Sequence, residues 1–299
     1  MISCYDEENR RKALNMDYLF YNELSDSSRG KEEGKTLYEE LKAHFPDLQL
    51  KSVQEVNPGE FIASCSEDDT VILAGGDGTL NHAINLLDPE QVKCRLLFRS
   101  FGTGNDFFND VADRQDPETK LVPLNEYIVG LPTIEVKGKT YRFINGIGFG
   151  IDGDCCVEAE RLKKEGAKDI NYSSITLKLL FGPFKPRKAT VTVDGVTKTF
   201  DKVYLASAMN GRYYGGGMNI APDQKRGSGL LTSVVIHGKG KLGTFMMFPG
   251  IIKGKHVKDK KHVEVLQGKE ITVTFDVPCG LQIDGEVVED VTTYKATIR

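Results

Sequence analysis

The chain has 299 residues, of which 39% are hydrophobic, and this is enough to bury the cores of two modest domains. Its 39 basic and 43 acidic side chains give a net charge of -4, which excludes the general basic surface typical of nucleic-acid binding. Six cysteines without C-x-x-C spacing indicate reduced thiols, and five scattered histidines form no metal-ligand pattern. We therefore expect a globular two-domain protein that binds no nucleic acid.

The apolar runs of the chain are short. None approaches the ~18 residues that a membrane-spanning helix needs. Residues 1–15 are polar and acidic, which predicts an N-terminal extension and excludes a secretory signal. We therefore expect a cytoplasmic protein whose contact with a membrane, if it makes one, is peripheral at the inner face.

The segment 16–125 alternates between short apolar runs and helical patterns. Strands are predicted at 17–21, 48–53, 70–74 and 94–99, and helices at 32–45, 59–65 and 80–87. Alternation of this kind predicts an α/β domain with a parallel sheet and helices on both faces.

The pattern changes after about residue 125. Strand-like runs separated by turn signals are predicted at 134–136, 141–144, 189–193, 202–208, 230–236, 270–275 and 294–298. Helices are predicted at 155–166, 172–181 and 241–252. The segment 126–290 is therefore expected to be a β-rich domain, mainly an antiparallel sandwich.

A glycine-rich loop, Gly75-Gly76-Asp77-Gly78-Thr79, joins the apolar strand at 70–74 to a helix. Glycines at such a junction let polyphosphate approach the backbone amides, and a carboxylate beside phosphate points to Mg²⁺ or to proton transfer. An ordinary β-turn is the alternative interpretation. The Walker pattern is absent, and we interpret the G-x-G-x-x-G string at 148–153 as accidental in a chain with 31 glycines.

Four motifs in order along the chain resemble the signatures of diacylglycerol kinase catalytic domains. They are Gly75-Gly-Asp-Gly-Thr-Leu-Asn81, Gly102-Thr-Gly-Asn-Asp-Phe107, Gly215-Gly-Gly217 before Ala221-Pro222, and Ile283-Asp-Gly-Glu286. The resemblance implies an α/β nucleotide domain, a β-sandwich domain, an active site in the cleft between them, and a return of residues 291–299 to the first domain. It also implies ATP and Mg²⁺ as cofactors and a lipid alcohol as substrate.

The resemblance also assigns roles to individual residues. Glu286 matches the proposed general base, with Asp77 and Asp284 as further catalytic candidates and Asp77 as the candidate Mg²⁺ ligand. The nucleotide-binding candidates are Asn22, Ser25, Gly75, Gly76, Asp77, Gly78, Thr79, Asn81, Gly102, Thr103, Asn105 and Asp106. A general base of this kind is worth ~10²- to 10⁴-fold in rate. For Asp284-Gly-Glu286 alone, a simple hairpin turn is the alternative.

Two departures from the family pattern stand out. Glu23 and Asp26 replace the usual Pro and Gly after Asn22, which predicts a differently shaped loop. Soluble bacterial members hold a structural Mg²⁺ with a Lys-x-x-Asp-x-Leu segment, whereas here Ser228 stands between Lys225 and Leu230 in place of the Asp. A neutral hydroxyl is a weaker ligand for a hard dication, so we expect this accessory metal site to be lost.

Aromatic and flexible apolar residues at 181–184, 213–214 and 245–249 are candidates for an acyl-chain pocket, although ordinary core explains most of them. A basic stretch at 253–262 could touch anionic headgroups or could be a solvated loop. Two other functions stay open: a kinase of a soluble substrate such as NAD, and a nucleotide-binding relative without activity. A homodimer is possible because β-rich domains expose strand edges.

Overall fold

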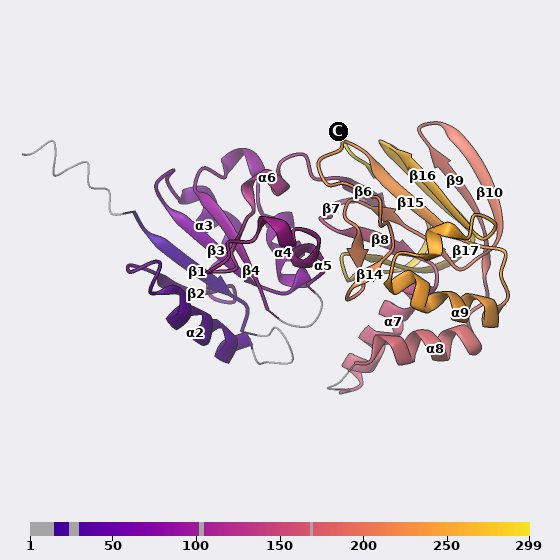
Figure 1. Ribbon diagram of the computed structural model, residues 1–299, viewed down its shortest axis with the longest axis horizontal. Coiled ribbons are helices and arrows are strands. Elements are labelled where there is room, and N and C mark those ends of the chain that lie inside the picture. The colour runs from indigo at the N-terminus through magenta and orange to yellow at the C-terminus, as the bar shows by residue number, and fades with distance from the viewer. Residues whose placement is uncertain (1–14, 24–29, 102–104, 168–169) are drawn as a thin grey trace, which may run out of the picture. The chain divides into compact units, whose positions relative to one another are not determined.

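The computed structural model describes residues 15–23, 30–101, 105–167 and 170–299 (Figure 1). The described residues of 1–102 form one compact unit together with Val111–Val129, and those of Thr103–Asp110 form a second unit with Gly130–Arg299. The expected boundary near residue 125 lies close to this division. Each unit is described by itself below.

The first unit is an α/β domain around a five-stranded sheet of order β2-β1-β3-β4-β5. Its strands are β1 (Asp17–Tyr21), β2 (Gln49–Ser52), β3 (Thr70–Gly75), β4 (Arg95–Ser100) and β5 (Val122–Pro123), of which only β5 is antiparallel to its neighbour. Its helices are α2 (Gly30–Leu41), α3 (Pro58–Ser64), α4 (Asp77–Leu86), α6 (Asn125–Ile128) and the 3₁₀ turns Pro89–Gln91 and Ala112–Arg114. The predicted parallel sheet is confirmed.

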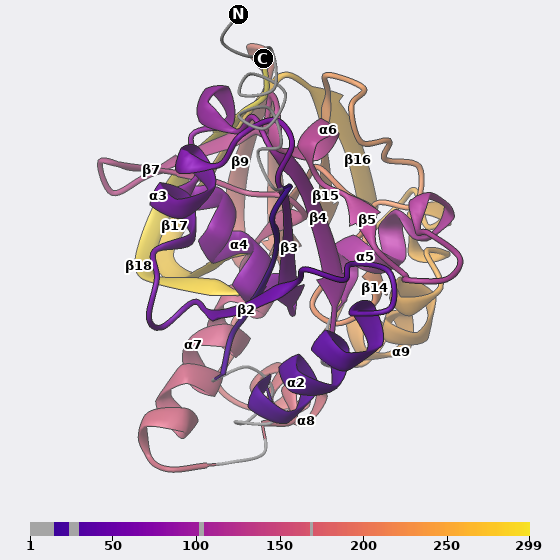
Figure 2. The same cartoon turned by 90° about the vertical axis from the view of Figure 1, so that its left-hand side faces the viewer.

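Helices cover both faces of this sheet because its central strands are apolar on both sides. Leu19 aligns with Ile72, and these residues pack with Leu37 and Leu41 of α2 on one face. Phe61 of α3 lies edge-on against Tyr18 on the other face, with ring centroids 4.8 Å apart. Figure 2 shows α3 and α4 together beside the strands, with α2 apart from them.

The second unit is built on an eleven-stranded sheet that folds into a sandwich. Its strands are β6 (Thr133–Val136), β7 (Lys139–Arg142), β8 (Gly146–Phe149), β9 (Arg187–Val193), β10 (Val196–Val203), β11 (Leu205–Ala206), β12 (Ala208–Met209), β15 (Leu231–Ile236), β16 (Val263–Gly268), β17 (Glu270–Ile283) and β18 (Glu286–Thr297), with β13 (Tyr213–Tyr214) and β14 (Met218–Asn219) as a separate pair. Its helices are α5 (Asp106–Asp110), α7 (Ile151–Lys164), α8 (Tyr172–Phe181), α9 (Lys241–Ile252) and the 3₁₀ turn His256–Lys258.

The expected return of residues 291–299 to the first domain is wrong. These residues extend β18, which pairs with β17 on one side and with β6 on the other. Tyr294, Ala296 and Ile298 alternate into the sandwich core, where they are almost completely buried. Burial of these apolar side chains holds the end of the chain in the second unit.

The helix α7 lies close against β17 because two glycines meet there. A Cβ at Gly153 would lie 1.9 Å from the Gly280 carbonyl oxygen, and a Cβ at Gly280 would lie 2.5 Å from the backbone of Gly153. No side chain fits in either place. Figure 1 shows α7 and α8 side by side beneath the sandwich, with α9 next to them.

The same contacts explain the G-x-G-x-x-G string at 148–153. A Cβ at Gly148 would lie 1.5 Å from Asp152 Oδ2, and one at Gly150 would lie 2.4 Å from the Tyr204 carbonyl oxygen. Gly150 also has a φ of 115°, which other residues rarely adopt. These glycines are therefore required by packing inside the protein, in agreement with the interpretation that the string is no dinucleotide fingerprint.

We predict that Gly153→Ala destabilises the protein by roughly 2–3 kcal/mol, because the added methyl group forces α7 away from β17. The matched control is Gly78→Ala, also within a helix, where a Cβ meets nothing within 4 Å. Alanine favours a helix over glycine by ~1 kcal/mol, so the control variant should be at least as stable as the wild type. Urea unfolding of the three proteins measures both effects, and equal midpoints for Gly153→Ala and the wild type would contradict the packing argument.

Candidate functional site

The glycine-rich loop lies where the buried strand β3 meets α4. Gly75 ends β3, Gly76 is the residue before the helix, and Asp77 is its first residue. The first turn of an α-helix has backbone N–H groups without partners inside the helix, and its dipole favours negative charge. The end of β3 therefore presents a helix N-terminus of the kind that binds phosphate.

The three glycines of this loop have different reasons to be there. A Cβ at Gly75 would lie 2.6 Å from the Thr79 side chain, so Gly75 is needed for packing within the loop. A Cβ at Gly78 would meet nothing within 4 Å, and one at Gly76 would meet only the Phe101 carbonyl oxygen at 3.6 Å. Packing against the described residues does not demand glycine at Gly76 or Gly78.

Two asparagines surround this loop. Asn22 Nδ2 donates to Thr79 Oγ1 at 3.3 Å, which ties the end of β1 to α4. Asn81 is buried, and its side-chain oxygen accepts from Asn85 Nδ2 at 3.2 Å. The structure thus brings Asn22, Thr79 and Asn81 to the same end of the sheet as Asp77. Ser25, Gly102 and Thr103 lie outside the described residues.

Asp106 begins α5 in the second unit and holds the triple-glycine motif. Its carboxylate accepts from the amides of Gly216 at 2.9 Å and Gly217 at 2.6 Å. All three glycines from Gly215 to Gly217 have a positive φ, which glycine adopts without strain. Asp106 therefore positions the loop between β13 and β14, and the neighbouring Asn105 adopts a left-handed turn with a φ of 52°.

The Asp284-Gly285 pair forms the two-residue turn between β17 and β18. Both residues have a positive φ, of 47° and 94°, as the preferred hairpin turns require. The Asp284 carboxylate accepts from three consecutive amides, those of Ile144 at 2.5 Å, Asn145 at 2.9 Å and Gly146 at 2.8 Å. This arrangement favours a positioning role for Asp284 over proton transfer.

Glu286 follows this turn as the first residue of β18, and its side chain is exposed. Its carboxylate makes no hydrogen bond to another described residue. An exposed carboxylate next to a turn that is fixed by Asp284 can accept a proton from a bound hydroxyl group. Of the two acidic residues of this motif, Glu286 is therefore the better candidate for a general base.

The segment from Lys225 to Leu230, which contains Ser228, is held by the side-chain amide of Gln224. The buried Gln224 Nε2 donates to the carbonyl oxygens of Leu230 at 2.9 Å and Lys225 at 3.4 Å. Ser228 is exposed and bonds only locally to Leu230. Within the described ranges, no three His, Cys, Asp or Glu side chains gather as metal ligands. The described residues here do not fit a structural Mg²⁺ ion, because Ser228 offers a neutral hydroxyl and Gln224 an amide donor.

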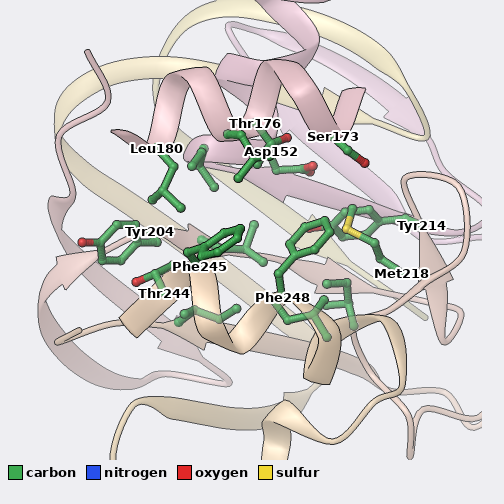
Figure 3. A pocket seen from close by; sticks show the side chains of 16 residues that line it. Asp152, Ser173, Thr176, Leu180, Tyr204, Tyr214, Met218, Thr244, Phe245 and Phe248 are labelled. Carbon is green, nitrogen blue, oxygen red and sulfur yellow. The ribbon is translucent and has the colours of Figure 1, made fainter. Parts of the chain in front are cut away.

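A cavity of about 120 Å³ lies among α7, α8 and α9 of the second unit (Figure 3). Its lining is mostly apolar; Phe245 and Phe248 extend from α9 into the cavity, and Phe248 lies beside Tyr214 and Met218. Of the aromatic residues proposed from the sequence, Tyr214, Phe245 and Phe248 do line this cavity. Phe184 is buried in the core instead, as the simpler interpretation predicted.

One polar corner interrupts this apolar lining. Asp152 of α7 accepts from Gln282 Nε2 at 3.1 Å, and burial of the carboxyl raises its pKa to about 6. The Tyr214 hydroxyl lies beside Asp152 without meeting hydrogen-bond geometry, and it has no other partner among the described residues. Burial, reinforced by the Asp152 charge, raises the Tyr214 pKa well above its ordinary value.

The sequence interpretation missed Asp152 and Asp110. Asp110 is buried and accepts from Arg212 Nε and Arg226 Nε, both at 2.5 Å, which fixes α5 within the second unit. The only signal for Asp110 was its place four residues after Asp106 on a helix. Asp152 lay within the G-x-G-x-x-G string that was set aside.

A strand-to-helix phosphate loop followed by a β-sandwich unit defines the class of kinases that carry a glycine-rich Gly-Gly-Asp-Gly loop. The comparisons with protein families make this specific. The model of the diacylglycerol kinase catalytic domain matches residues 17–130, and that of the YegS C-terminal NAD kinase beta sandwich-like domain matches residues 145–297, just over half of the chain. The chain belongs to this family of diacylglycerol kinase-type lipid kinases.

Individual relatives agree with this assignment. A Staphylococcus epidermidis protein named "Putative lipid kinase SERP0390" is 26% identical over 93% of this chain and 92% of its own length. The Bacillus subtilis protein named "Putative lipid kinase YtlR" is 26% identical over 73% of this chain and 74% of its own length. A crystal structure from Bacillus anthracis, titled as a putative diacylglycerol kinase, has the same fold, with a TM-score of 0.69, 21% identity and coverage of 95% of this chain and 92% of that one.

We predict that Asp152 makes the protein less stable as the pH rises from about 4 to 7. Its folded-state pKa of about 6 lies above the ordinary value of 3.8, so the folded protein binds the proton more tightly than the unfolded chain. The stabilising contribution of the protonated form is complete below the unfolded pKa and is lost as the pH rises through 6. Asp152→Asn removes this titration, so its stability relative to the wild type should increase by roughly 3 kcal/mol over this range.

Urea unfolding at several pH values measures the difference. The control is Asp201→Asn, which alters an exposed carboxylate on β10 and should follow the wild-type pH dependence. A constant difference between Asp152→Asn and the wild type at every pH would contradict a buried, titrating Asp152.

Proposed function

We propose that the protein transfers the γ-phosphoryl group of ATP to a hydroxyl group of a lipid, assisted by Mg²⁺. The observation that carries this proposal is the junction of β3 and α4, where a buried strand passes through Gly75 and Gly76 into a helix N-terminus that begins with Asp77. The family assignment supports a lipid as the acceptor. Diacylglycerol is the acceptor that the name of the catalytic-domain family suggests.

The nucleotide phosphates bind at the first turn of α4 in this proposal. Among the described residues, a Cβ at Gly78 would meet nothing within 4 Å and one at Gly76 only a backbone oxygen at 3.6 Å, which supports a close approach of phosphate oxygens to the amides there. Thr79, held by Asn22, borders the same turn. Charge-assisted hydrogen bonds of this kind are about twice as strong as neutral ones.

Asp77 is the residue that would hold Mg²⁺. Mg²⁺ is commonly bound by one or two carboxylates together with the phosphates of a nucleotide, so a single carboxylate at the phosphate-binding turn fits it. The bound ion would neutralise the charge that develops on the transferred group. Without an ion, the carboxylate of Asp77 would repel the phosphates.

The proton of the lipid hydroxyl goes to Glu286. As the hydroxyl oxygen forms its bond to the γ-phosphorus, the bond from that phosphorus to the bridging oxygen breaks, and ADP leaves with the electron pair. The hydroxyl proton moves to the Glu286 carboxylate, which later releases it to water. Asp284 contributes by fixing the turn before Glu286 through its three amide hydrogen bonds.

The acyl chain of the lipid occupies the cavity among α7, α8 and α9. Its lining is mostly aliphatic and aromatic, which suits an alkyl chain. The polar corner formed by Asp152 and Tyr214 could accept a hydrogen bond from the glycerol part of the lipid or donate one to it. A cavity of about 120 Å³ is smaller than a typical ligand pocket, so it holds only a part of one chain.

The direct test is incubation of the full chain with labelled ATP, Mg²⁺ and a panel of detergent-dispersed lipid alcohols, with NAD in parallel. The panel contains diacylglycerol, monoacylglycerol, phosphatidylglycerol, a sphingoid base and a polyprenol. We expect label in at least one lipid and none in NAD. Label in NAD alone would establish the soluble-substrate kinase instead, and label in neither would favour a nucleotide-binding protein without activity.

We predict that Glu286→Gln lowers kcat by at least 100-fold and leaves the affinity for ATP nearly unchanged. Glutamine has nearly the same shape as glutamate but cannot accept the proton. The matched control is Glu289→Gln, which alters another exposed glutamate of β18 and should keep wild-type turnover. Steady-state kinetics and ATP-binding calorimetry measure both quantities, and wild-type turnover in Glu286→Gln would refute its role as the base.

A further inference from the structure

The helix α9 is apolar around its whole circumference but is not buried around it. Its twelve residues include no acidic side chain, and only Met247 and Ile251 are buried. Leu242, Phe245, Met246 and Ile252 are 40–73% exposed. A helix that is apolar all round normally lies inside a core or in contact with lipid.

The exposed residues of α9 form one stripe. Residues three and four apart share a helix face, so Leu242, Phe245, Met246 and Ile252 lie on the side opposite the buried residues. This stripe continues onto α8, where the Phe181 ring lies edge-on against Phe245 at a centroid distance of 5.6 Å. We call the α8–α9 face the set formed by Leu177, Phe181, Leu242, Phe245, Met246 and Ile252, all of which are at least 40% exposed.

The segments that form this face are basic, whereas the neighbouring helix α7 carries acidic residues, of which Glu158 interacts with Lys178. The sequence contains no Asp or Glu from residue 170 to 193 or from 236 to 258, although the chain has 43 acidic residues. The same two segments contain four and five Lys or Arg residues. Lys178 of α8 and Lys253 at the end of α9 are exposed, and Lys241 Nζ donates to the Gly182 carbonyl oxygen, which joins the two helix ends.

The cavity opens on this face. Leu177 and Phe245 line the cavity and are also 40% exposed, so its mouth lies between α8 and α9 (Figure 3). Along the described part of the chain, no helix is long and apolar enough to cross a bilayer. An exposed apolar face with a basic rim fits the surface of an anionic membrane, where each nearby lysine adds attraction.

We propose that the α8–α9 face docks on the surface of a bilayer that contains anionic lipids, with the side chains of α9 inserted among the acyl chains. A second copy of the chain fits less well, because a symmetric contact would bring the lysines of both copies together. A protein partner would close the mouth of the cavity. A membrane instead brings lipid to that mouth, a choice that rests on the acyl-chain cavity of the proposed function but not on phosphoryl transfer.

The test is co-sedimentation of the full chain, without ATP, with vesicles of phosphatidylcholine alone or mixed with phosphatidylglycerol. We expect binding to the mixed vesicles and at least tenfold weaker binding for Leu242→Ser/Met246→Ser. These residues are exposed, so their substitution leaves the fold intact. The matched control is Val196→Ser/Val277→Ser, which removes two exposed apolar residues from strands and should bind as the wild type does.

A second pair of variants tests the charge. Lys178→Gln/Lys253→Gln should weaken binding to the mixed vesicles, whereas Lys137→Gln/Lys139→Gln, with the same net charge but changes in and beside β7, should not. Equal binding by the wild type and the α9 variant, or no binding by the wild type, would overturn the proposal. So would a dimer of the wild type, seen by analytical ultracentrifugation, that the α9 substitutions dissociate.

The outcomes remain separable from those of the kinase assay. Vesicle binding without phosphorylation of any detergent-dispersed lipid would support the docking face and refute the proposed reaction. Phosphorylation of dispersed lipid without vesicle binding would support the proposed reaction and refute the docking face.

Discussion

The Asp284 carboxylate accepts hydrogen bonds from three consecutive backbone N–H groups, and much of the second unit follows from this interaction. The amides of Ile144, Asn145 and Gly146 lead directly into β8, so the hairpin turn of β17 and β18 is fixed against the start of that strand. An acceptor with three amide donors is costly to remove from a buried place, because each N–H would lose its partner. The two-residue turn leaves no freedom in where Glu286 begins β18.

β8 connects this hairpin turn to the residues that line the cavity. β8 ends at Phe149, and the positive φ of Gly150 then turns the chain into α7, whose first residues include Asp152. The contact of Gly153 with Gly280 then holds α7 on β17 at backbone distance. Gln282 of β17 donates to Asp152, so the turn, the strand and the polar corner of the cavity form one connected network. Substitutions at these positions are therefore expected to have non-additive effects on stability.

The sequence was most informative where local patterns decide the structure. Alternating apolar runs predicted the parallel sheet, and β3 followed by glycines and α4 was found where the loop motif placed it. The fate of residues 291–299 was predicted wrongly, because the pairing of β18 with β6 joins segments about 160 residues apart and no local signal reports it. The sequence predicted where the cavity lies but not all of the residues that line it. Aromatic residues marked its neighbourhood, but the choice between lining and core for Phe248 and Phe184 depends on tertiary packing.

The side-chain amide of Gln224 joins the two ends of the segment that includes Ser228. The amide of Gln224 is covalently part of the chain and donates to the carbonyl oxygens of Lys225 and Leu230. The two ends of the segment are therefore joined by a hydrogen-bond partner that is encoded in the chain itself.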